Sequence, residues 1–439
     1  MSANQLTDLL GDNCVLWDAV SPERQAKILS AVAGSQPPVA IAYPTSTEAL
    51  GKVMALACAQ KWRVLPMGQA SKIGWGGLAT GIDIVVSTAK LNRVVEHAVG
   101  DFTVTVEPGV TFAELRSQLA EHNQLLAIDP SFCDQATVGG IVATADAGSF
   151  RQRYGGLRDM LIGVQFVRYD GEVARAGGRV VKNVAGYDLM KLMTGAYGSL
   201  GILSELTFRL YPMNQVSQTL VLSGGETALE QAVAEVRMSG LTPVAMDLTL
   251  ARQAARLTDG GDRPHMSLIA RFQGIADGVE EQTVRLKKIG TTHGMHIQQL
   301  EGDADMRYWQ QVSGLIHSGT VLCKVGMRPS ALPPVLAMLE DAALHGQAQV
   351  ILHGSSGLGW VQWPEAVVKD DTFLQALEKM RSYCQSNGGF LTLLQAPKAL
   401  KQATDVWGYA GNALKVMSDI KDKFDPHKLL GPGRFVGGL

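Results

Sequence analysis

Pro66-Met67-Gly68-Gln69-Ala70-Ser71-Lys72 is the stretch on which the fold prediction rests, because it directly follows a predicted strand at residues 63–67. A loop of small residues in that position can point successive backbone N–H groups inward and hold a pyrophosphate. Ser71 would add a hydroxyl donor and Lys72 a positive charge. An ordinary surface loop could have the same composition, so this loop alone does not distinguish a phosphate site from a turn.

Two further glycine-rich regions follow in a chain that has 48 glycines. The second contains Ala136-Thr137-Val138-Gly139-Gly140, where a helix starting near Val138 would direct N–H groups at an anion and the glycines would let the backbone approach a flat ligand. The third contains Gly195-Ala196-Tyr197-Gly198-Ser199-Leu200-Gly201-Ile202. Each region alone could be a set of tight turns. Together, with strands predicted between them, the three regions indicate a ligand-binding domain.

A neighbouring run, Gly74-Trp75-Gly76-Gly77-Leu78-Ala79, matches the GxGxxA dinucleotide fingerprint. That fingerprint joins a strand directly to a helix. Here a strand is predicted to follow at residues 82–87, with no helix between. We therefore do not expect a Rossmann site, and the sequence contains no GxxxxGK[ST] phosphate loop.

The sequence pattern changes after Pro212. Apolar periodicity predicts the order strand, helix, strand, strand, helix, strand, which is that of a ferredoxin-like unit, at residues 217–223, 226–238, 243–250, 265–272, 278–289 and 295–300. The same order recurs between residues 320 and 394. We predict an α+β protein with a first domain at residues 1–212, rejoined by a tail at 405–439. A cap at 213–404 would consist of two ferredoxin-like units.

Composition narrows the class of protein. A net charge of -2 over 439 residues gives no support for nucleic-acid binding. No apolar stretch is long enough to span a membrane, and the N-terminus lacks a secretory signal pattern. The five cysteines form no CxxC pair, so neither a metal site nor an iron–sulfur cluster is expected in this chain. These features favour a cytoplasmic protein that reaches the inner face of a membrane only through partners.

The three glycine regions resemble those of FAD-binding proteins of the vanillyl-alcohol oxidase type. The tail, Phe424-Asp425-Pro426 through Gly431-Pro432-Gly433-Arg434, resembles the family's FDP…NPG ending, with Gly431 where Asn is usual. The resemblance covers about residues 38–212 and the tail. It implies a two-subdomain, PCMH-type FAD-binding domain and FAD as cofactor.

The resemblance also implies where FAD lies. The first loop would hold the pyrophosphate, the second region would run along the flavin, and the third would back the adenine. The residues expected to bind FAD are Pro66, Met67, Gly68, Gln69, Ala70, Ser71, Lys72, Asp129, Pro130, Thr137, Val138, Gly139, Gly140, Ala143, Thr144, Gly148, Tyr154, Gly155, Asp159, Gly198, Gly201 and Ile202. Covalent relatives attach FAD through His or Cys. The first loop has neither, and a thioether at Cys133 is not expected, so we predict non-covalent FAD.

Within this family, the run Val181-Lys182-Asn183-Val184-Ala185-Gly186-Tyr187-Asp188-Leu189 is most similar to the FAD-binding E subunits of glycolate oxidase (glycolate dehydrogenase). That similarity implies glycolate catabolism, as in photorespiration, with a small 2-hydroxy acid as substrate. It also implies a complex with a second FAD-binding subunit and an iron–sulfur subunit that passes electrons to quinone at a membrane.

Oxidation of a 2-hydroxy acid needs a cation for the carboxylate and a base for the hydroxyl proton. Arg151 and Arg153 are the candidate cations, although solvated loop arginines would fit the same pattern. His353, at the end of a predicted strand, is the candidate base. Catalytic relatives carry an HxGDGNxH run here that binds a metal; in this sequence Leu352 and Gly359 replace its two histidines. No metal is therefore expected.

This departure leaves three hypotheses open. In the first, the chain binds FAD while the substrate is oxidised mainly on a partner subunit. In the second, the chain is itself a flavin-dependent 2-hydroxy-acid dehydrogenase with an unusual base. In the third, it is a non-catalytic structural partner.

Overall fold

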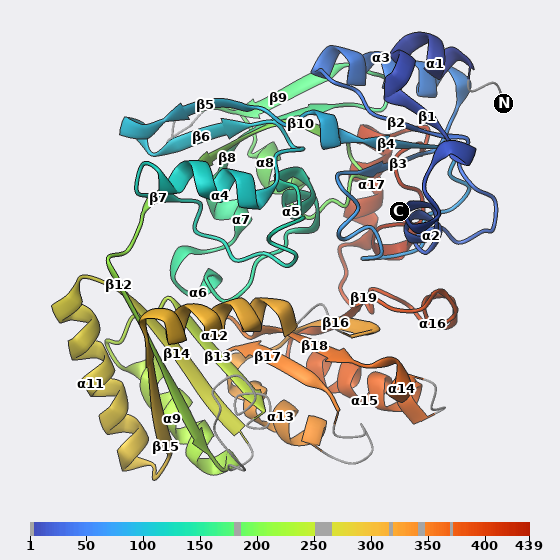
Figure 1. Ribbon diagram of the computed structural model, residues 1–439. Helices are drawn as coiled ribbons and strands as arrows, with labels where there is room; N and C mark the ends of the chain where they lie inside the picture. The colour runs from blue at the N-terminus through green and yellow to red at the C-terminus, as the bar shows by residue number, and fades with distance from the viewer. Residues whose placement is uncertain (1–3, 180–185, 251–265, 316–318, 341–346, 369–371) are drawn as a thin grey trace. The chain divides into compact units, whose positions relative to one another are not determined.

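The computed structural model describes residues 4–179, 186–250, 266–315, 319–340, 347–368 and 372–439 (Figure 1). The chain forms two compact units. The first comprises residues 1–146, 156–212 and 397–439, and the second comprises 147–155 and 213–396. Two segments differ from the division expected from the sequence. Residues 147–155 pack with the second unit, and residues 397–404 pack with the first.

The first unit begins with a small, mainly parallel sheet of order β1-β2-β4-β3, in which only β1 is antiparallel. Its strands are β1 (Cys14–Leu16), β2 (Ala40–Ala42), β3 (Val64–Met67) and β4 (Ile84–Ser87). Apolar residues cover both of its faces, as expected for parallel strands buried on both sides. The flanking helices are α1 (Asn4–Leu10), α2 (Pro22–Leu29) and α3 (Thr47–Gln60).

A second, antiparallel sheet of order β5-β6-β10-β8-β9 completes the strand framework of this unit. Its strands are β5 (Val94–Ala98), β6 (Thr103–Val106), β8 (Leu161–Val167), β9 (Val173–Gly177) and β10 (Ile202–Arg209). The helices beside it are α4 (Phe112–Ala120), α5 (Val138–Thr144), α7 (Leu157–Met160) and α8 (Leu189–Met193). A short ribbon pairs β7 (Gln124–Leu125) with β11 (Tyr211–Pro212).

The C-terminal tail returns to the first sheet through α16 (Lys398–Ala403) and α17 (Leu414–Phe424). Asp425 is fully buried; it accepts a hydrogen bond from Lys421 Nζ (2.6 Å) and others from the backbone N–H groups of Leu429 (3.0 Å) and Leu430 (2.8 Å). Leu430 then forms a parallel bridge with Val64 of β3. The aspartate of the Phe-Asp-Pro motif therefore has a structural role, which is to turn the tail onto β3.

The second unit contains one eight-stranded sheet of order β15-β12-β14-β13-β17-β18-β16-β19. Its strands are β12 (Val216–Gly224), β13 (Ala245–Leu250), β14 (Met266–Gly274), β15 (His296–Glu301), β16 (Val321–Gly326), β17 (Gln349–His353), β18 (Leu358–Trp363) and β19 (Phe390–Gln395). Each half has the strand order of a ferredoxin-like unit. The halves join edge to edge through two residue pairs, Asp247–His353 and Leu248–Leu352.

The helices of this unit are α6 (Arg151–Tyr154), α9 (Glu226–Met238), α11 (Ala276–Thr292), α12 (Gly302–Leu315), α13 (Leu332–Glu340), α14 (Glu365–Val368) and α15 (Thr372–Ser386). One face of the sheet, with Leu248 and Leu352, is apolar, and α9, α11, α13 and α15 pack against it. The other face carries Asp247, His353 and Arg271, and α12 lies on it (Figure 1).

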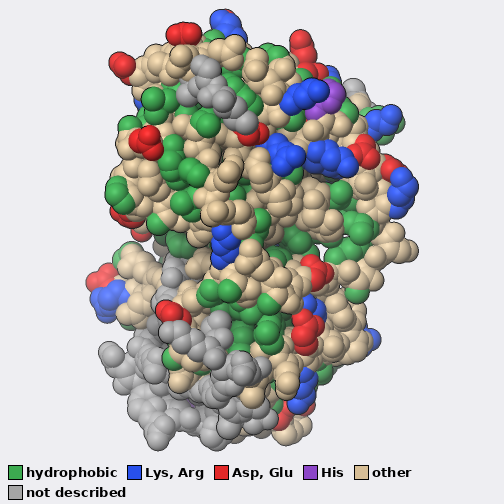
Figure 2. Space-filling model, turned by 90° about the vertical axis from the view of Figure 1, so that its right-hand side faces the viewer, with side chains coloured by type: hydrophobic (Ala, Val, Ile, Leu, Met, Phe, Trp, Pro, Cys, Tyr) green, Lys and Arg blue, Asp and Glu red, His purple; other side chains and the backbone are tan. Residues whose placement is uncertain are grey.

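On the face drawn in Figure 2, acidic and basic side chains are interspersed rather than gathered into a field of one sign. Among the described residues, no helix is long and apolar enough to cross a membrane.

Candidate functional site

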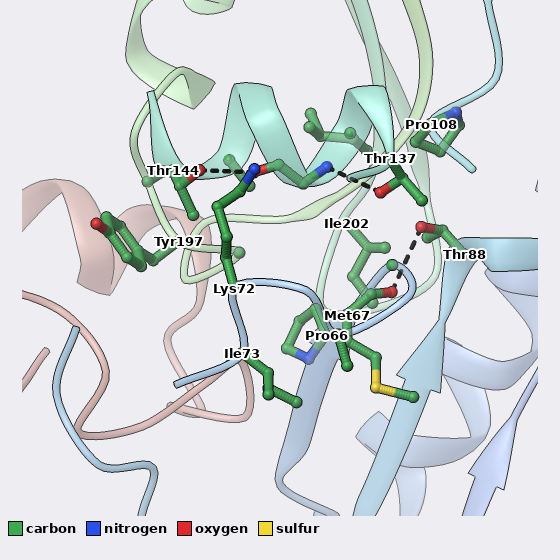
Figure 3. A pocket seen from close by; sticks show the side chains of 18 of the residues that line it. Pro66, Met67, Lys72, Ile73, Thr88, Pro108, Thr137, Thr144, Tyr197 and Ile202 are labelled. Atoms are coloured by element: carbon green, nitrogen blue, oxygen red, sulfur yellow. Dashed lines mark hydrogen bonds between the residues drawn. The ribbon is translucent and has the colours of Figure 1, made fainter. Parts of the chain in front are cut away.

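The first unit contains a pocket whose empty space, counted together with the part open to solvent, is about 820 Å³. Segments far apart in the sequence line it: the loop after β3, helix α5 and residues 193–203 (Figure 3). Arg434 of the tail lines it as well. Its position at the carboxyl end of the parallel strand β3 follows the general rule for ligand sites in such sheets.

The loop after β3 forms a cradle for an anion. Within the part of the chain that the structure describes, the backbone N–H groups of Gln69, Ala70, Ser71 and Lys72 have no protein acceptor. Ala70 has a left-handed backbone conformation, with φ +63°, which turns successive N–H groups toward the same side. Four neighbouring N–H groups without a protein acceptor fit the pyrophosphate of FAD.

Lys72 lines the pocket but already has a counter-charge. Its side chain is buried and lies 3.1 Å from Asp146, and in Figure 3 it runs from the loop toward Thr144 of α5. Asp146 also accepts hydrogen bonds from the backbone N–H (2.9 Å) and Oγ (3.2 Å) of Ser131. Burial lowers the pKa of Lys72, and Asp146 opposes that shift. The pair therefore ties the loop after β3 to the segments that contain Ser131 and Asp146.

The start of α5 explains why glycines are needed in the second region. Thr137 caps the helix by accepting a hydrogen bond from Gly140 N (3.3 Å). A Cβ on Gly139 would lie 2.5 Å from Cβ of Pro108, and a Cβ on Gly68 would lie 2.2 Å from Oγ1 of Thr137. Side chains at either glycine would separate elements that line the pocket together.

Arg434 brings a buried guanidinium to the pocket from the C-terminal tail. Its NH1 donates to Gly77 O (3.0 Å), and its own carbonyl accepts from Gly77 N (3.0 Å). Burial lowers its pKa to about 10, so the side chain stays charged at neutral pH. Tyr197, also buried in the lining, has its pKa raised by burial.

The Gly74–Ala79 run packs against this tail instead of starting a helix. A Cβ on Gly77 would lie 2.3 Å from the carbonyl oxygen of Gly433. Lys401 holds the same run by donating to the carbonyls of Gly74 and Gly76. Burial, and secondarily Arg434, lowers the pKa of Lys401 to about 7. These glycines allow close approach of two backbones, which agrees with the expectation that the run is not a Rossmann fingerprint.

The second unit holds the predicted base in a buried polar chain. His353 Nδ1 lies 2.8 Å from Asp247 Oδ1, and Asp247 Oδ2 accepts a hydrogen bond from Ser149 Oγ. Among the described residues, His353 Nε2 has no hydrogen-bond partner, nor does the hydroxyl of buried Tyr308. Asp247 also contributes to the raised pKa of Tyr308, after burial. This chain of groups could orient the imidazole for proton transfer.

Arg151 and Arg153, the predicted carboxylate ligands, lie on the short helix α6 of the second unit and are both exposed. Within the described ranges neither pairs with a carboxylate. Their charges are therefore not neutralised by an ion pair.

The pocket brings together most of the residues expected to bind FAD: Pro66, Met67, Gly68, Gln69, Ala70, Ser71, Lys72, Thr137, Gly139, Gly140, Ala143, Thr144, Gly198, Gly201 and Ile202. Others lie elsewhere. Val138 is fully buried, Asp129 and Pro130 are outside the lining, and Asp159 caps α7 by accepting from Gly156 N. Gly148, Tyr154 and Gly155 belong to the second unit.

Sequence reasoning missed further lining residues: Ile73, Thr88, Pro108, Met193, Ala196, Tyr197, Leu203 and Arg434. The GPGR ending and the Ala196-Tyr197-Gly198 run were the available signals for Arg434 and Tyr197. Cys133 is not in the described lining. Residues 181–185 of the run similar to E subunits lie outside the described residues.

Comparisons with known proteins bear on the cofactor and the fold. Residues 38–177 match the FAD binding domain family. The chain is 28% identical over 418 residues to glycolate oxidase subunit GlcD of Bacillus subtilis (strain 168), covering 90% of this chain and 88% of that subunit. It is 31% identical over 199 residues to subunit GlcE of Escherichia coli (strain K12), covering 45% of this chain and 55% of GlcE.

A third relative is the mitochondrial D-lactate dehydrogenase [cytochrome] of Arabidopsis thaliana, 30% identical over 261 residues. That match covers 58% of this chain but less than half (46%) of the plant enzyme.

Among solved structures, p-cresol methylhydroxylase with substrate bound has a TM-score of 0.73 at 16% identity, covering 98% of this chain and 95% of that one. An alkyldihydroxyacetonephosphate synthase has a TM-score of 0.71 at 16% identity, covering 98% and 85%. These likenesses confirm the predicted PCMH-type α+β fold, and the family match confirms FAD as the cofactor.

Proposed function

We propose that this FAD-binding oxidoreductase oxidises a small 2-hydroxy acid, with glycolate as the first candidate, to the 2-oxo acid. The observation that carries the proposal is the anion cradle of residues 69–72 in a chain whose relatives are named as oxidases and dehydrogenases of 2-hydroxy acids. The cradle supports flavin binding, and the relatives support the substrate class.

The reaction removes two electrons and two protons from the substrate. Bound FAD would supply the acceptor for the hydride from C2, and the hydroxyl proton must pass to a base. We propose His353 for that role, because its Nδ1 is held by Asp247 and its Nε2 is not committed to another described residue. We propose Arg151 or Arg153 as the group that binds the substrate carboxylate, since a guanidinium can do so through two parallel hydrogen bonds.

We further propose that the chain works as the E-type subunit of a glycolate oxidase complex. The similarity to GlcE and GlcD supports a complex of two flavin subunits. The described cysteines are all free, and no group of three or more potential metal ligands occurs among the described residues. Electrons would therefore leave through a separate iron–sulfur subunit, and any contact with a membrane would be made through partners.

A second candidate is a stand-alone flavin-dependent 2-hydroxy-acid dehydrogenase. The buried Ser149–Asp247–His353 chain favours it, because a purely structural subunit would have no need of an oriented imidazole. A non-catalytic partner subunit would instead have a pocket that binds flavin weakly or not at all.

The test is the absorbance spectrum of the purified chain, alone and co-expressed with a second flavin subunit and an iron–sulfur subunit. We expect bound flavin that acid precipitation releases, since no covalent link is predicted. Anaerobic glycolate, D-lactate or D-2-hydroxyglutarate should bleach it. Bleaching of the isolated chain would favour the stand-alone dehydrogenase, and bleaching only in the complex would favour the E-type subunit. Flavin that no 2-hydroxy acid reduces in either preparation would overturn the proposal.

A further inference from the structure

Arg434 and Lys72, the two charged residues of the described pocket lining, differ in whether a carboxylate neutralises them. Lys72 is neutralised by Asp146 at 3.1 Å. Arg434 is 5% exposed, and no carboxylate pairs with it among the described residues. Burying a charge without a counter-charge is strongly unfavourable. A buried guanidinium that lines a pocket and has no counter-charge among the described residues calls for an anionic ligand.

The position of this guanidinium is fixed by the backbone around it. Arg434 and Gly77 exchange two hydrogen bonds, one from Gly77 N to the Arg434 carbonyl and one from Arg434 NH1 to the Gly77 carbonyl, both 3.0 Å. Gly433, with φ +87°, leads the tail into this contact, and a Cβ on Gly77 would clash with its carbonyl. The charge is thus held in place before any ligand arrives, which lowers the entropic cost of binding.

Burial, and after it the charge of Arg434, lowers the pKa of a second cation, Lys401. Lys401 donates to the carbonyls of Gly74 and Gly76, the same loop that holds Arg434. Its pKa is lowered first by burial and then by the nearby Arg434. An anion bound against Arg434 would relieve this repulsion, so the local charge is complementary to an anionic ligand.

We propose that Arg434 is a cofactor-binding residue whose guanidinium binds an anionic oxygen of FAD, complementing the N–H cradle of residues 69–72. Two parts of the cofactor carry the required chemistry: the pyrophosphate, which is always charged, and the isoalloxazine ring, which gains negative charge on reduction. Nothing in the residue pattern of the first three glycine regions indicates this role, because the residue reaches the pocket from the end of the chain.

The experiment compares Arg434→Gln and Arg434→Lys with the wild type and with a control, Arg116→Gln, which removes a 58%-exposed arginine from α4 of the same unit. FAD is titrated into the flavin-free proteins by fluorescence quenching, and the midpoint potential of each reconstituted protein is measured. Far-UV circular dichroism checks the fold. Arg434→Gln should weaken FAD binding about 10- to 100-fold, the range of a charge-assisted hydrogen bond, with Arg434→Lys between it and the wild type.

The pyrophosphate and the isoalloxazine ring predict different changes in FAD affinity and midpoint potential. Weaker binding of oxidised FAD with an unchanged potential assigns Arg434 to the pyrophosphate. Unchanged binding of oxidised FAD with a lower potential assigns it to the ring. If Arg434→Gln does not fold, Arg434→Lys carries the test, and inorganic pyrophosphate should raise the melting temperature of the flavin-free wild type more than that of the lysine variant. Affinity within twofold of the control and an unchanged potential would refute the inference.

Discussion

The buried Lys72–Asp146 pair allows a stringent test of how the pocket is held together. In Asp146→Asn, Lys72 stays buried without a counter-charge, while Ser131 loses a charged acceptor for its two hydrogen bonds. Breaking a buried ion pair by removing one partner costs about 3–5 kcal/mol. That is a large share of the roughly 5–15 kcal/mol by which folded proteins are stable. Removing both charges, in Lys72→Met/Asp146→Asn, should cost much less than the sum of the single changes.

The stability of Asp146→Asn should depend on pH because of Lys72. Burial depresses the pKa of Lys72 in the folded state, and without Asp146 nothing opposes that shift. The unfolded chain then binds more protons than the folded one between the depressed pKa and the ordinary lysine value of 10.5, so stability rises with pH across this window. The deficit of Asp146→Asn relative to the wild type should therefore shrink as the pH approaches 10.

Urea unfolding of the flavin-free proteins measures these differences, followed by tryptophan fluorescence with Trp75 as a local reporter 5.7 Å from Lys72 Nζ. Glu48→Gln is the matched control, because it breaks an exposed ion pair with Lys52 on α3 and should leave the urea midpoint almost unchanged. If the double variant shows the plain sum of the two single effects, Lys72 and Asp146 do not stabilise each other, and the reasoning fails.

Three further outcomes are expected. Gly68→Ala places a Cβ 2.2 Å from Thr137 Oγ1 and should weaken FAD binding at least about tenfold in a fluorescence titration, whereas Gly100→Ala, whose Cβ meets nothing within 4 Å, should bind like the wild type. The pKa of Lys401 is about 7 in the folded protein. The free energy of unfolding of the wild type, minus that of Lys401→Met, should therefore rise by about 1.4 kcal/mol per pH unit between about pH 7 and 10.5. A difference that does not change with pH would contradict this pKa. His353→Gln should slow anaerobic flavin reduction by a 2-hydroxy acid about 10²- to 10⁴-fold at unchanged flavin content; equal rates would exclude it as the base.

Much of the second unit could be predicted from the sequence because its strands and helices carry strong periodic patterns. The helix expected at residues 226–238 is α9 (Glu226–Met238), and the strand order of both halves follows from the βαββαβ pattern. Their edge-to-edge union could not be predicted. It depends on two residue pairs between β13 and β17, and alternation within a strand does not specify which edge it will pair with.

In the first unit, the sequence predicted those features that are formed by residues adjacent in the chain. The strands predicted at residues 63–67 and 82–87 are β3 (Val64–Met67) and β4 (Ile84–Ser87). The loop of residues 66–72 lines the pocket as one contiguous segment, so its composition was enough. Thr88, Pro108 and Arg434 reach the same pocket through tertiary approach, for which a sequence offers no periodic signal.

The seam of the eight-stranded sheet, where β13 pairs with β17, bears on whether this chain itself catalyses a reaction. Leu248–Leu352, the apolar pair at the seam, shows that two strand edges can be joined there without charge. The neighbouring Asp247–His353 pair is a less favourable way to join them, since an unpartnered buried nitrogen such as His353 Nε2 costs about 1–3 kcal/mol. A residue that weakens the seam is easier to explain by a proton-transfer role than by a structural one. The relatives' metal-binding histidines are absent from the flanking positions 352 and 359. If the chain oxidises a hydroxy acid itself, we propose the imidazole of His353 as its base.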